Sequence, residues 1–179
     1  MSVIAFRITE NKAQVAFDGR CIYDGDSIGS ENFIKAHRIS DSLIVGITGL
    51  ADTCEMFKRF VEVNKRVFEE ITCNTDAIPM MIRFKNALIE RYGFVEDELK
   101  DLGGFLVVNK NYHAVYYFDE DTFRPYPTKD TVNCAAFGST GIYTSALLDA
   151  GMSLENAIKM SAKKYTSIND NVTVLEIER

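Results

Sequence analysis

The stretch Ser2-Val-Ile-Ala-Phe-Arg-Ile8, followed by Gln14-Val-Ala-Phe-Asp-Gly-Arg20, decides how this chain folds. Both segments are rich in alanine, β-branched and aromatic residues, a composition that favours β-strands. The residues Glu10-Asn11-Lys12 between them favour a turn. We therefore predict that strands over residues 2–8 and 13–17 form a hairpin at the start of the fold.

The length and composition are typical of one globular domain with a hydrophobic core. The chain has 179 residues, of which 46% are hydrophobic, and a chain of this size buries roughly 70% of its unfolded surface. We expect residues 1–179 to form a single domain. The formal net charge is -6 and no block of consecutive basic residues occurs, so we expect neither nucleic acid nor a membrane as a partner.

The cysteines and the apolar segments indicate the compartment. The four cysteines have no C-x-x-C spacing, so the sequence predicts neither a disulfide framework nor a zinc site. No apolar stretch approaches the ~18 residues of a membrane span, and the first residues lack the pattern of a secretory signal. We expect a cytoplasmic protein with free thiols and no metal or cofactor. The cysteines are Cys21, Cys54, Cys73 and Cys134.

The remaining segments alternate between strand pairs and helices. Residues 33–39 and 42–48 predict a second hairpin, and the apolar spacing over residues 51–72 predicts one long amphipathic helix. Strands in hairpins and helices in pairs favour antiparallel sheets covered by helices over βαβ units. The other predicted elements are a helix over 76–92, a hairpin of strands 103–108 and 112–118, a polar stretch over 119–130, a strand over 132–137, helices over 140–148 and 153–164, and a closing strand over 171–177.

Ser2 directly follows the initiator methionine, and removal of Met1 would make it the first residue. The hydroxyl and the α-amine, a nucleophile and a base, would then belong to one residue. An α-amine has a pKa of about 7.7–8.0, so it can accept the hydroxyl proton near neutral pH. Retention of Met1 would leave Ser2 without a free amine.

Several motifs occur in the order and at the spacing of a known family. Residues Ser2–Arg20 are similar to the start of mature proteasome β-type subunits and of the peptidase HslV, where a catalytic residue opens one strand and an Asp-Gly pair follows on the next. Ser27–Ile39 resembles the block whose lysine precedes a hydrophobic strand. Gly46–Asp52 resembles the glycine turn before a long helix. Phe137–Gly141 and Leu147–Ala157 resemble the Gly-Ser-Gly turn and the two closing helices.

The resemblance implies both a fold and a reaction. The fold is α+β, a four-layer α-β-β-α sandwich of two antiparallel sheets flanked by helix pairs. The reaction is peptide-bond hydrolysis by an N-terminal nucleophile, through an acyl-enzyme on Ser2 Oγ, with serine in place of the family's threonine. The resemblance also implies a polypeptide substrate, a homo-oligomeric ring and an ATP-dependent unfoldase as a partner.

Further roles follow from the resemblance residue by residue. Lys35 matches the lysine whose charge lowers the cost of the developing alkoxide, and Asp18 matches the carboxylate that keeps this lysine charged. Gly49 matches the residue whose backbone N–H faces the substrate carbonyl, and Ser139 matches a serine near the amine. The pocket for the substrate residue before the cut bond, expected to prefer apolar side chains, would be lined by Cys21, Phe33 and Ile47.

Two positions depart from the family pattern. Thr140 stands where the family usually has glycine, and Lys164, three residues before Ser167, stands where it has an aspartate. A positive charge from Lys164 close to Ser2 would lower the pKa of the amine and weaken it as a base. A catalytically silent ring or scaffold subunit therefore stays open as an alternative.

A third hypothesis is an elbow-type esterase. Gly25-Asp26-Ser27-Ile28-Gly29 matches the pattern G-x-S-x-G and resembles the Gly-Asp-Ser block of certain esterases. An elbow needs a following helix and a downstream acid and histidine. We disfavour it because residues 30–39 are predicted as strand, with Ser27 in a polar connection. Neither His37 nor His113 belongs to an Asp-x-x-His motif or has the neighbours of a metal site.

Overall fold

The structure is a computed structural model that describes residues 2–23 and 27–179. Its strands are β1 (Val3–Ile8), β2 (Lys12–Asp18), β3 (Cys21–Tyr23), β4 (Ser27–Ser30), β5 (Ala36–Ser40), β6 (Leu43–Thr48), β7 (Gly104–Asn109), β8 (His113–Phe118), β9 (Pro125–Thr128), β10 (Cys134–Gly138) and β11 (Val172–Glu178). Its helices are α1 (Ala51–Val63), α2 (Lys65–Glu70), α3 (Asn74–Tyr92), the 3-10 helix η1 (Glu96–Asp101), α4 (Gly141–Asp149) and α5 (Leu154–Lys164).

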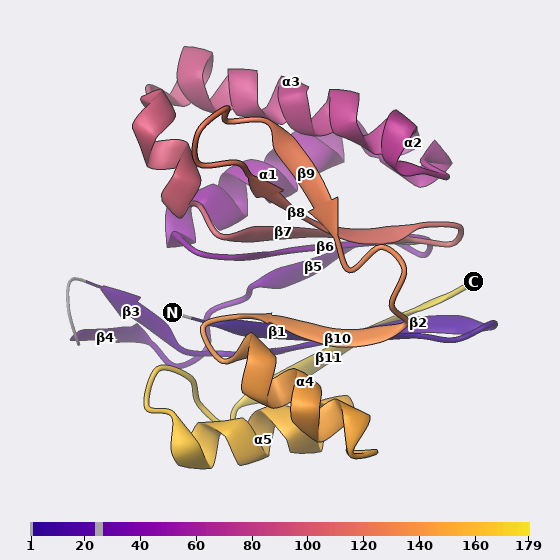
Figure 1. Cartoon of the computed structure of the whole chain (residues 1–179), viewed down its shortest axis with the longest axis vertical. Helices are drawn as coiled ribbons and strands as arrows, with labels where there is room; N and C mark the ends of the chain where they lie inside the picture. The colour runs from indigo at the N-terminus through magenta and orange to yellow at the C-terminus, as the bar shows by residue number, and fades with distance from the viewer. Residues whose placement is uncertain (1, 24–26) are drawn as a thin grey trace.

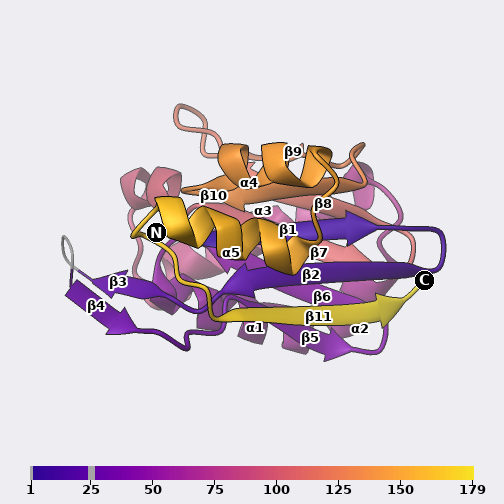
Figure 2. The ribbon, with the colours of Figure 1, turned by 90° about the horizontal axis from the view of Figure 1, so that it is seen from below.

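The strands form two large antiparallel sheets and one small hairpin. The four-stranded sheet has the order β10-β1-β2-β11, the five-stranded sheet has the order β5-β6-β7-β8-β9, and β3 pairs with β4. Figure 1 shows α1, α2 and α3 on the outer side of the five-stranded sheet, and α4 and α5 on the outer side of the four-stranded sheet. Seen from below, in Figure 2, the β3–β4 hairpin extends beyond the four-stranded sheet. The prediction of an α+β fold with antiparallel sheets is confirmed.

The predicted first hairpin is confirmed, and both faces of its strands are buried. Ile4 and Phe6 belong to the apolar cluster between the two sheets, whereas Val3 and Ala5 belong to the cluster under α4 and α5. Alternate residues of a strand point to opposite faces, so a strand buried on both faces needs a continuous apolar run. The composition of the opening segment follows from this position in the middle of the molecule.

The helix predicted over residues 51–72 is wrong as one element, because it is broken at Asn64 between α1 and α2. The side-chain amide of Asn64 donates to the carbonyl of Phe60 at 2.8 Å, and its backbone has φ -107° and ψ 20°. An asparagine side chain that bonds a carbonyl of the preceding turn competes with the helix backbone. The apolar spacing continues across Asn64, so it did not reveal the break.

Strands in three other segments differ from the predictions. The strand predicted over residues 33–39 begins only at Ala36, and residues before it are irregular. The polar stretch predicted over 119–130 contains β9, which tolerates Pro125 and Pro127 because it is the edge strand of its sheet. The β3–β4 hairpin was not predicted, and Ser27 lies in β4 rather than in a connection.

None of the helices within the described ranges is long and apolar enough to cross a membrane.

Candidate active site

Ser2 precedes β1 and lines a cavity of about 660 Å³ at one end of the molecule. Its carbonyl accepts hydrogen bonds from the backbone N–H of Ser139 at 2.9 Å and from Ser139 Oγ at 3.2 Å. Gly138 has φ +101°, and a Cβ there would lie 2.2 Å from the carbonyl oxygen of Ser2. Only glycine permits this approach, so the turn between β10 and α4 holds Ser2 in place.

Asp18 and Lys35 form a buried ion pair directly beside the start of β1. Lys35 Nζ lies 2.6 Å from Asp18 Oδ1, and the same oxygen accepts the backbone N–H of Val3 at 2.9 Å. Asp18 Oδ2 accepts the backbone N–H of Arg20 at 3.0 Å. The exposed fractions are 3% for Lys35 and 0% for Asp18. The carboxylate therefore joins the ammonium group to the residue that follows Ser2.

The electrostatics of the cavity centre on Lys35, which lines it together with Ser2. Burial lowers the pKa of Lys35, and the attraction and hydrogen bond of Asp18 oppose this shift. Asp18 is the side-chain partner of Nζ among the described residues. An ammonium group has three N–H donors, so the site retains donors that could bind an oxygen atom in the cavity.

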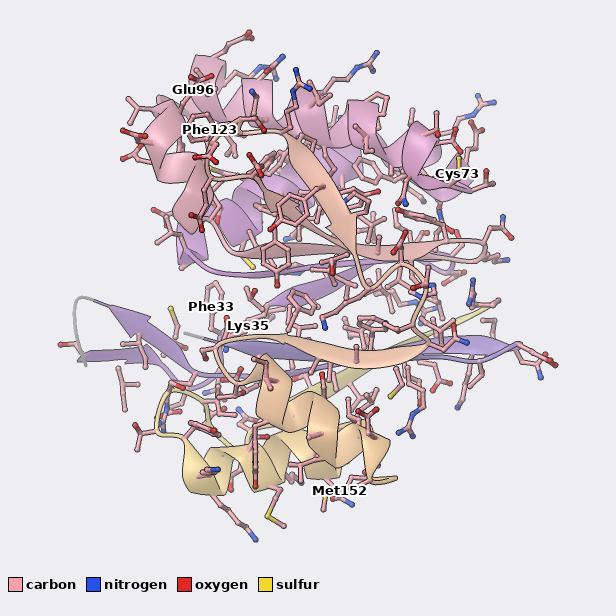
Figure 3. All side chains as sticks on the ribbon, viewed as in Figure 1. Phe33, Lys35, Cys73, Glu96, Phe123 and Met152 are labelled. Carbon is pink, nitrogen blue, oxygen red and sulfur yellow. The ribbon has the colours of Figure 1, made fainter. Side chains whose placement is uncertain are left out.

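Three side chains expected in an apolar pocket line the same cavity, namely Cys21, Phe33 and Ile47. Figure 3 shows Phe33 and Lys35 close together, at the end of the molecule where the β3–β4 hairpin projects. Cys54 also lines the cavity, and burial raises the pKa of its thiol to about 12. Cys54 is therefore a protonated thiol at neutral pH and contributes to the wall as a small apolar group.

Gly49 borders the cavity where β6 leads into α1. It has φ +148°, and a Cβ there would lie 1.9 Å from the carbonyl oxygen of Leu102. Gly103, opposite, has φ +84°, and its Cβ would lie 1.5 Å from the carbonyl oxygen of Thr48. The two backbones pass too closely for side chains. The first residues of α1 also line the cavity, so the positive end of the helix dipole lies beside it together with the acidic residue Asp52.

The two residues that depart from the family pattern have partners of their own. Thr140 Oγ1 lies 3.4 Å from Thr144 Oγ1, which lies 2.8 Å from Ser161 Oγ. Lys164 Nζ lies 4.4 Å from the centroid of the Tyr143 ring, a cation–π contact. As far as the chain is described, the lining of the Ser2 cavity includes neither Thr140 nor Lys164.

The residues of the esterase hypothesis do not form an elbow. Ser27 is exposed and is followed by the rest of strand β4, whereas an elbow needs a helix there; Gly25 and Asp26 lie outside the described residues. His37 is on β5 and His113 is on β8, and burial lowers the pKa of both. His113 Nε2 pairs with the carbonyl of Val132 at 3.0 Å.

Sequence analysis missed several side chains of the cavity. Arg20, Phe94 and Tyr117 line it, but Phe94 and Tyr117 come from segments with no recognisable motif. Arg20 could have been found, because it stands two residues after Asp18 on the same turn.

Within residues 2–23 and 27–179, no group of three or more His, Cys, Asp or Glu side chains is arranged to hold a metal ion.

The two facing antiparallel sheets, with helices on the outer side of each, have the fold of HslV. The resemblance seen in the sequence is confirmed for the fold. The chain is similar to HslV from Trypanosoma brucei, with 14% identity, coverage of 99% of both chains and a TM-score of 0.69. It is also similar to Thiobacillus denitrificans BPH, with 17% identity, 98% and 97% coverage and a TM-score of 0.72.

The same Thiobacillus protein in complex with epoxomicin matches with 17% identity, 98% coverage of both chains and a TM-score of 0.70. A scan against protein-family models and a search of curated protein sequences find no match. The similarity is therefore found in the three-dimensional structure and not in overall sequence identity.

Proposed function

We propose that this protein is a proteasome- and HslV-like peptidase that hydrolyses peptide bonds with Ser2 as its N-terminal nucleophile, once Met1 is removed. The observation that carries the proposal is the placement of Ser2 in one cavity with the buried ammonium group of Lys35. Nucleophile, positive charge and an apolar wall thus surround the same space, which is the arrangement that acyl transfer requires.

In the proposed mechanism, the α-amine of Ser2 accepts the proton of Oγ while Oγ attacks the substrate carbonyl carbon. The backbone N–H of Gly49 and the charge of Lys35 stabilise the negative charge that develops. The protonated amine then gives its proton to the departing amine, and an ester on Ser2 Oγ remains. Water attacks this ester, with the amine as base, and the free acid leaves as Ser2 is regenerated.

The substrate preference follows from the apolar wall of the cavity. Cys21, Phe33 and Ile47 favour an apolar side chain before the cut bond. A panel of fluorogenic peptides that vary only at this position measures the preference. Equal or better cleavage of the acidic and basic peptides would overturn this part of the proposal.

We extend the proposal to the whole assembly. Residues 1–179 would form a single four-layer α-β-β-α sandwich, assembled as a cytoplasmic homo-oligomeric ring that receives polypeptides from an ATP-dependent unfoldase. The fold similarity over 99% of Trypanosoma brucei HslV supports the domain boundaries. Light scattering of the purified protein tests the ring, since a monomer of 20.2 kDa would contradict it.

The decisive experiment examines the first residue of the protein made in its own cell. Intact-mass spectrometry should show loss of Met1, and a β-lactone or boronate probe should then label Ser2. Because Cys73 is an exposed thiol, labelling is compared in a Cys73→Ser background with and without Ser2→Ala. Retained Met1, or equal labelling of both proteins, would reject the mechanism, and the silent ring or scaffold subunit would then be favoured.

A further inference from the structure

The segment 31–35 carries two groups of the site, Phe33 and Lys35, but it belongs to no helix or strand. Two backbone hydrogen bonds anchor it, from Phe33 N–H to the carbonyl of Gly19 at 2.7 Å and from Ile47 N–H to the carbonyl of Lys35 at 2.9 Å. An irregular segment without a complete ladder of backbone bonds needs other contacts to hold one conformation. Side chains from two distant parts of the chain supply them.

Glu31, at the start of this segment, receives five hydrogen bonds. Its carboxylate accepts two parallel bonds from Arg20, Nε at 3.2 Å and Nη2 at 2.8 Å, and a third from Asn169 Nδ2. Its carbonyl accepts from Asn169 Nδ2 at 2.9 Å and from Asn171 Nδ2 at 3.1 Å. A bidentate arginine pair fixes orientation as well as distance.

Asn169 connects this segment to the turn that follows the Asp18 carboxylate. Its Oδ1 accepts the backbone N–H of Gly19 at 2.9 Å, while its Nδ2 binds Glu31. Arg20 Nη1 donates to the carbonyl of Thr166 at 2.5 Å. A Cβ on Gly19 would lie only 2.4 Å from the carbonyl oxygen of Glu31, so the two backbones are in direct contact.

The burial and charge of these groups suit a rigid connection. Asn169 is only 7% exposed, and both polar atoms of its amide are hydrogen bonded. The hydrogen bonds from Arg20 and Asn169 lower the pKa of Glu31, so its carboxylate is charged at neutral pH. The Glu31 side chain is 44% exposed, so the buried part of this network is the Asn169 amide, and a buried amide with both polar atoms bonded favours one geometry.

We propose that Asn169 and Glu31 are positioning residues for Lys35 and Phe33. Together with Arg20 and Asn171 they form a set that we name the Glu31 clamp. The clamp holds segment 31–35 against the Asp18–Arg20 turn, so that the Lys35 ammonium reaches Asp18 and the Phe33 ring forms the cavity wall. Its role in catalysis rests on the proposed function, whereas its role in placing Lys35 does not.

The placement is tested first by NMR of protein labelled with ¹³C at the lysine ε-carbon. The Lys35 signal is assigned by its disappearance in Lys35→Met. In Asn169→Ala, segment 31–35 loosens and water reaches the ammonium group, so the Lys35 signal should shift and its pKa should rise toward the ordinary lysine value. Asn156→Ala, the same change at an exposed site on α5, should leave the signal unchanged.

A second pair of variants keeps the test decisive if Asn169→Ala does not fold. Asn169→Asp preserves the acceptor for Gly19 but places a carboxylate against Glu31, so the Lys35 signal should shift. Adding Glu31→Gln removes this repulsion and supplies an amide that can donate to the new carboxylate. The Lys35 signal should then return most of the way to its wild-type position. An unshifted Lys35 signal in a folded Asn169 variant, or no restoration in the double variant, would overturn the inference.

Peptide cleavage then tests the catalytic consequence. Asn169→Ala should lower kcat about 10- to 100-fold through Lys35 and raise KM for peptides with a large apolar residue before the cut bond through Phe33. If Asn169→Ala only reduced the fraction of folded protein, the β-lactone would titrate fewer sites and KM would not change. An inactive wild-type protein rejects the proposed function alone, because the Lys35 signal still decides whether the clamp places Lys35.

Discussion

The backbone N–H of Val3 and the ammonium group of Lys35 donate to the same oxygen, Oδ1 of Asp18, at 2.9 and 2.6 Å. Val3 follows Ser2 directly, so one carboxylate oxygen fixes the distance between the start of β1 and the buried charge. A substitution at Asp18 therefore alters the position of Ser2 and the charge state of Lys35 together.

Asp18→Asn is expected to destabilise the protein strongly. It leaves the Lys35 ammonium buried without a counter-charge, a change that typically costs about 3–5 kcal/mol in the free energy of unfolding. The loss should shrink as the pH rises. Burial lowers the pKa of Lys35 in the folded protein. Between that folded pKa and the unfolded pKa near 10.4, the folded state binds fewer protons than the unfolded state, so the free energy of unfolding increases with pH.

Urea unfolding of Asp18→Asn at pH 7 and at pH 9.5 measures this effect. Adding Lys35→Met removes the buried charge and should recover part of the stability at pH 7. A deficit in the single variant that is the same at both pH values would show that Lys35 is not the source of the penalty.

Gly49→Ala is expected to lower the free energy of unfolding more than Gly151→Ala, which only strains the backbone. Its Cβ would lie 1.9 Å from a carbonyl oxygen, whereas a Cβ on Gly151, which also has a positive φ, meets nothing within 4 Å. We expect about 1–2 kcal/mol for Gly151→Ala and more than about 4 kcal/mol, or failure to fold, for Gly49→Ala. Thermal and urea unfolding compare the two, and equal losses would mean that the loop around Leu102 moves aside freely.

The sequence predicted the centre of the molecule better than its periphery. The opening hairpin was predictable because both of its strands are rich in alanine, β-branched and aromatic residues and a polar turn separates them. The break at Asn64 was not predictable, since it depends on one side-chain amide that bonds a carbonyl within an otherwise regular apolar pattern. Strand β9 was missed because two prolines argue against a central strand, and only the topology shows that β9 is an edge strand.

Ser2→Ala should abolish peptide hydrolysis without unfolding the protein. The described residues offer no hydrogen-bond partner to Ser2 Oγ, and the contacts that hold Ser2 use its carbonyl. We expect a loss of activity of at least about 10³-fold and little change in Tm, while Ser2→Thr should retain activity. Fluorogenic peptide assays and thermal unfolding measure the two effects, and full activity in Ser2→Ala would exclude Ser2 as the nucleophile.

Ile47→Val should enlarge the apolar pocket and shift the preference toward larger side chains. The loss of one methyl group from a buried residue costs about 0.5–1.5 kcal/mol of stability and should change the kcat/KM ratio of two peptides about 10-fold. Ile44→Val is the matched control, because Ile44 is equally buried on the same strand but belongs to the cluster between the sheets. A similar shift in both variants would mean that Ile47 does not define the pocket.

The Glu31 clamp should weaken in acid. Hydrogen bonds from Arg20 and Asn169 lower the pKa of Glu31, so its stabilising contribution is present above the unfolded pKa near 4.3 and is lost as the pH falls through the folded value. Urea unfolding between pH 3.5 and pH 7 should therefore show a difference between wild type and Glu31→Gln that shrinks toward low pH. Glu10→Gln, in the exposed turn after β1, should show no such trend.

The candidate site was partly predictable because its central residues stand in short motifs. Ser2, Asp18, Lys35, Gly49 and Ser139 could be named before the structure, and the structure places all five around or directly beside one cavity. Asn169 and Glu31 could not be named, because isolated polar residues in irregular segments have neither periodicity nor a motif. Their role depends on a contact between residues 138 positions apart.

The position of Asn169 near the end of the chain has a consequence for synthesis. Asn169, on whose bonds the proposed placement of Lys35 beside Asp18 depends, is made more than 160 residues after Ser2. A nascent chain would therefore carry the proposed nucleophile long before the residues that complete the proposed site are made. Under the proposed function, the order of translation keeps a half-made chain from cleaving other proteins.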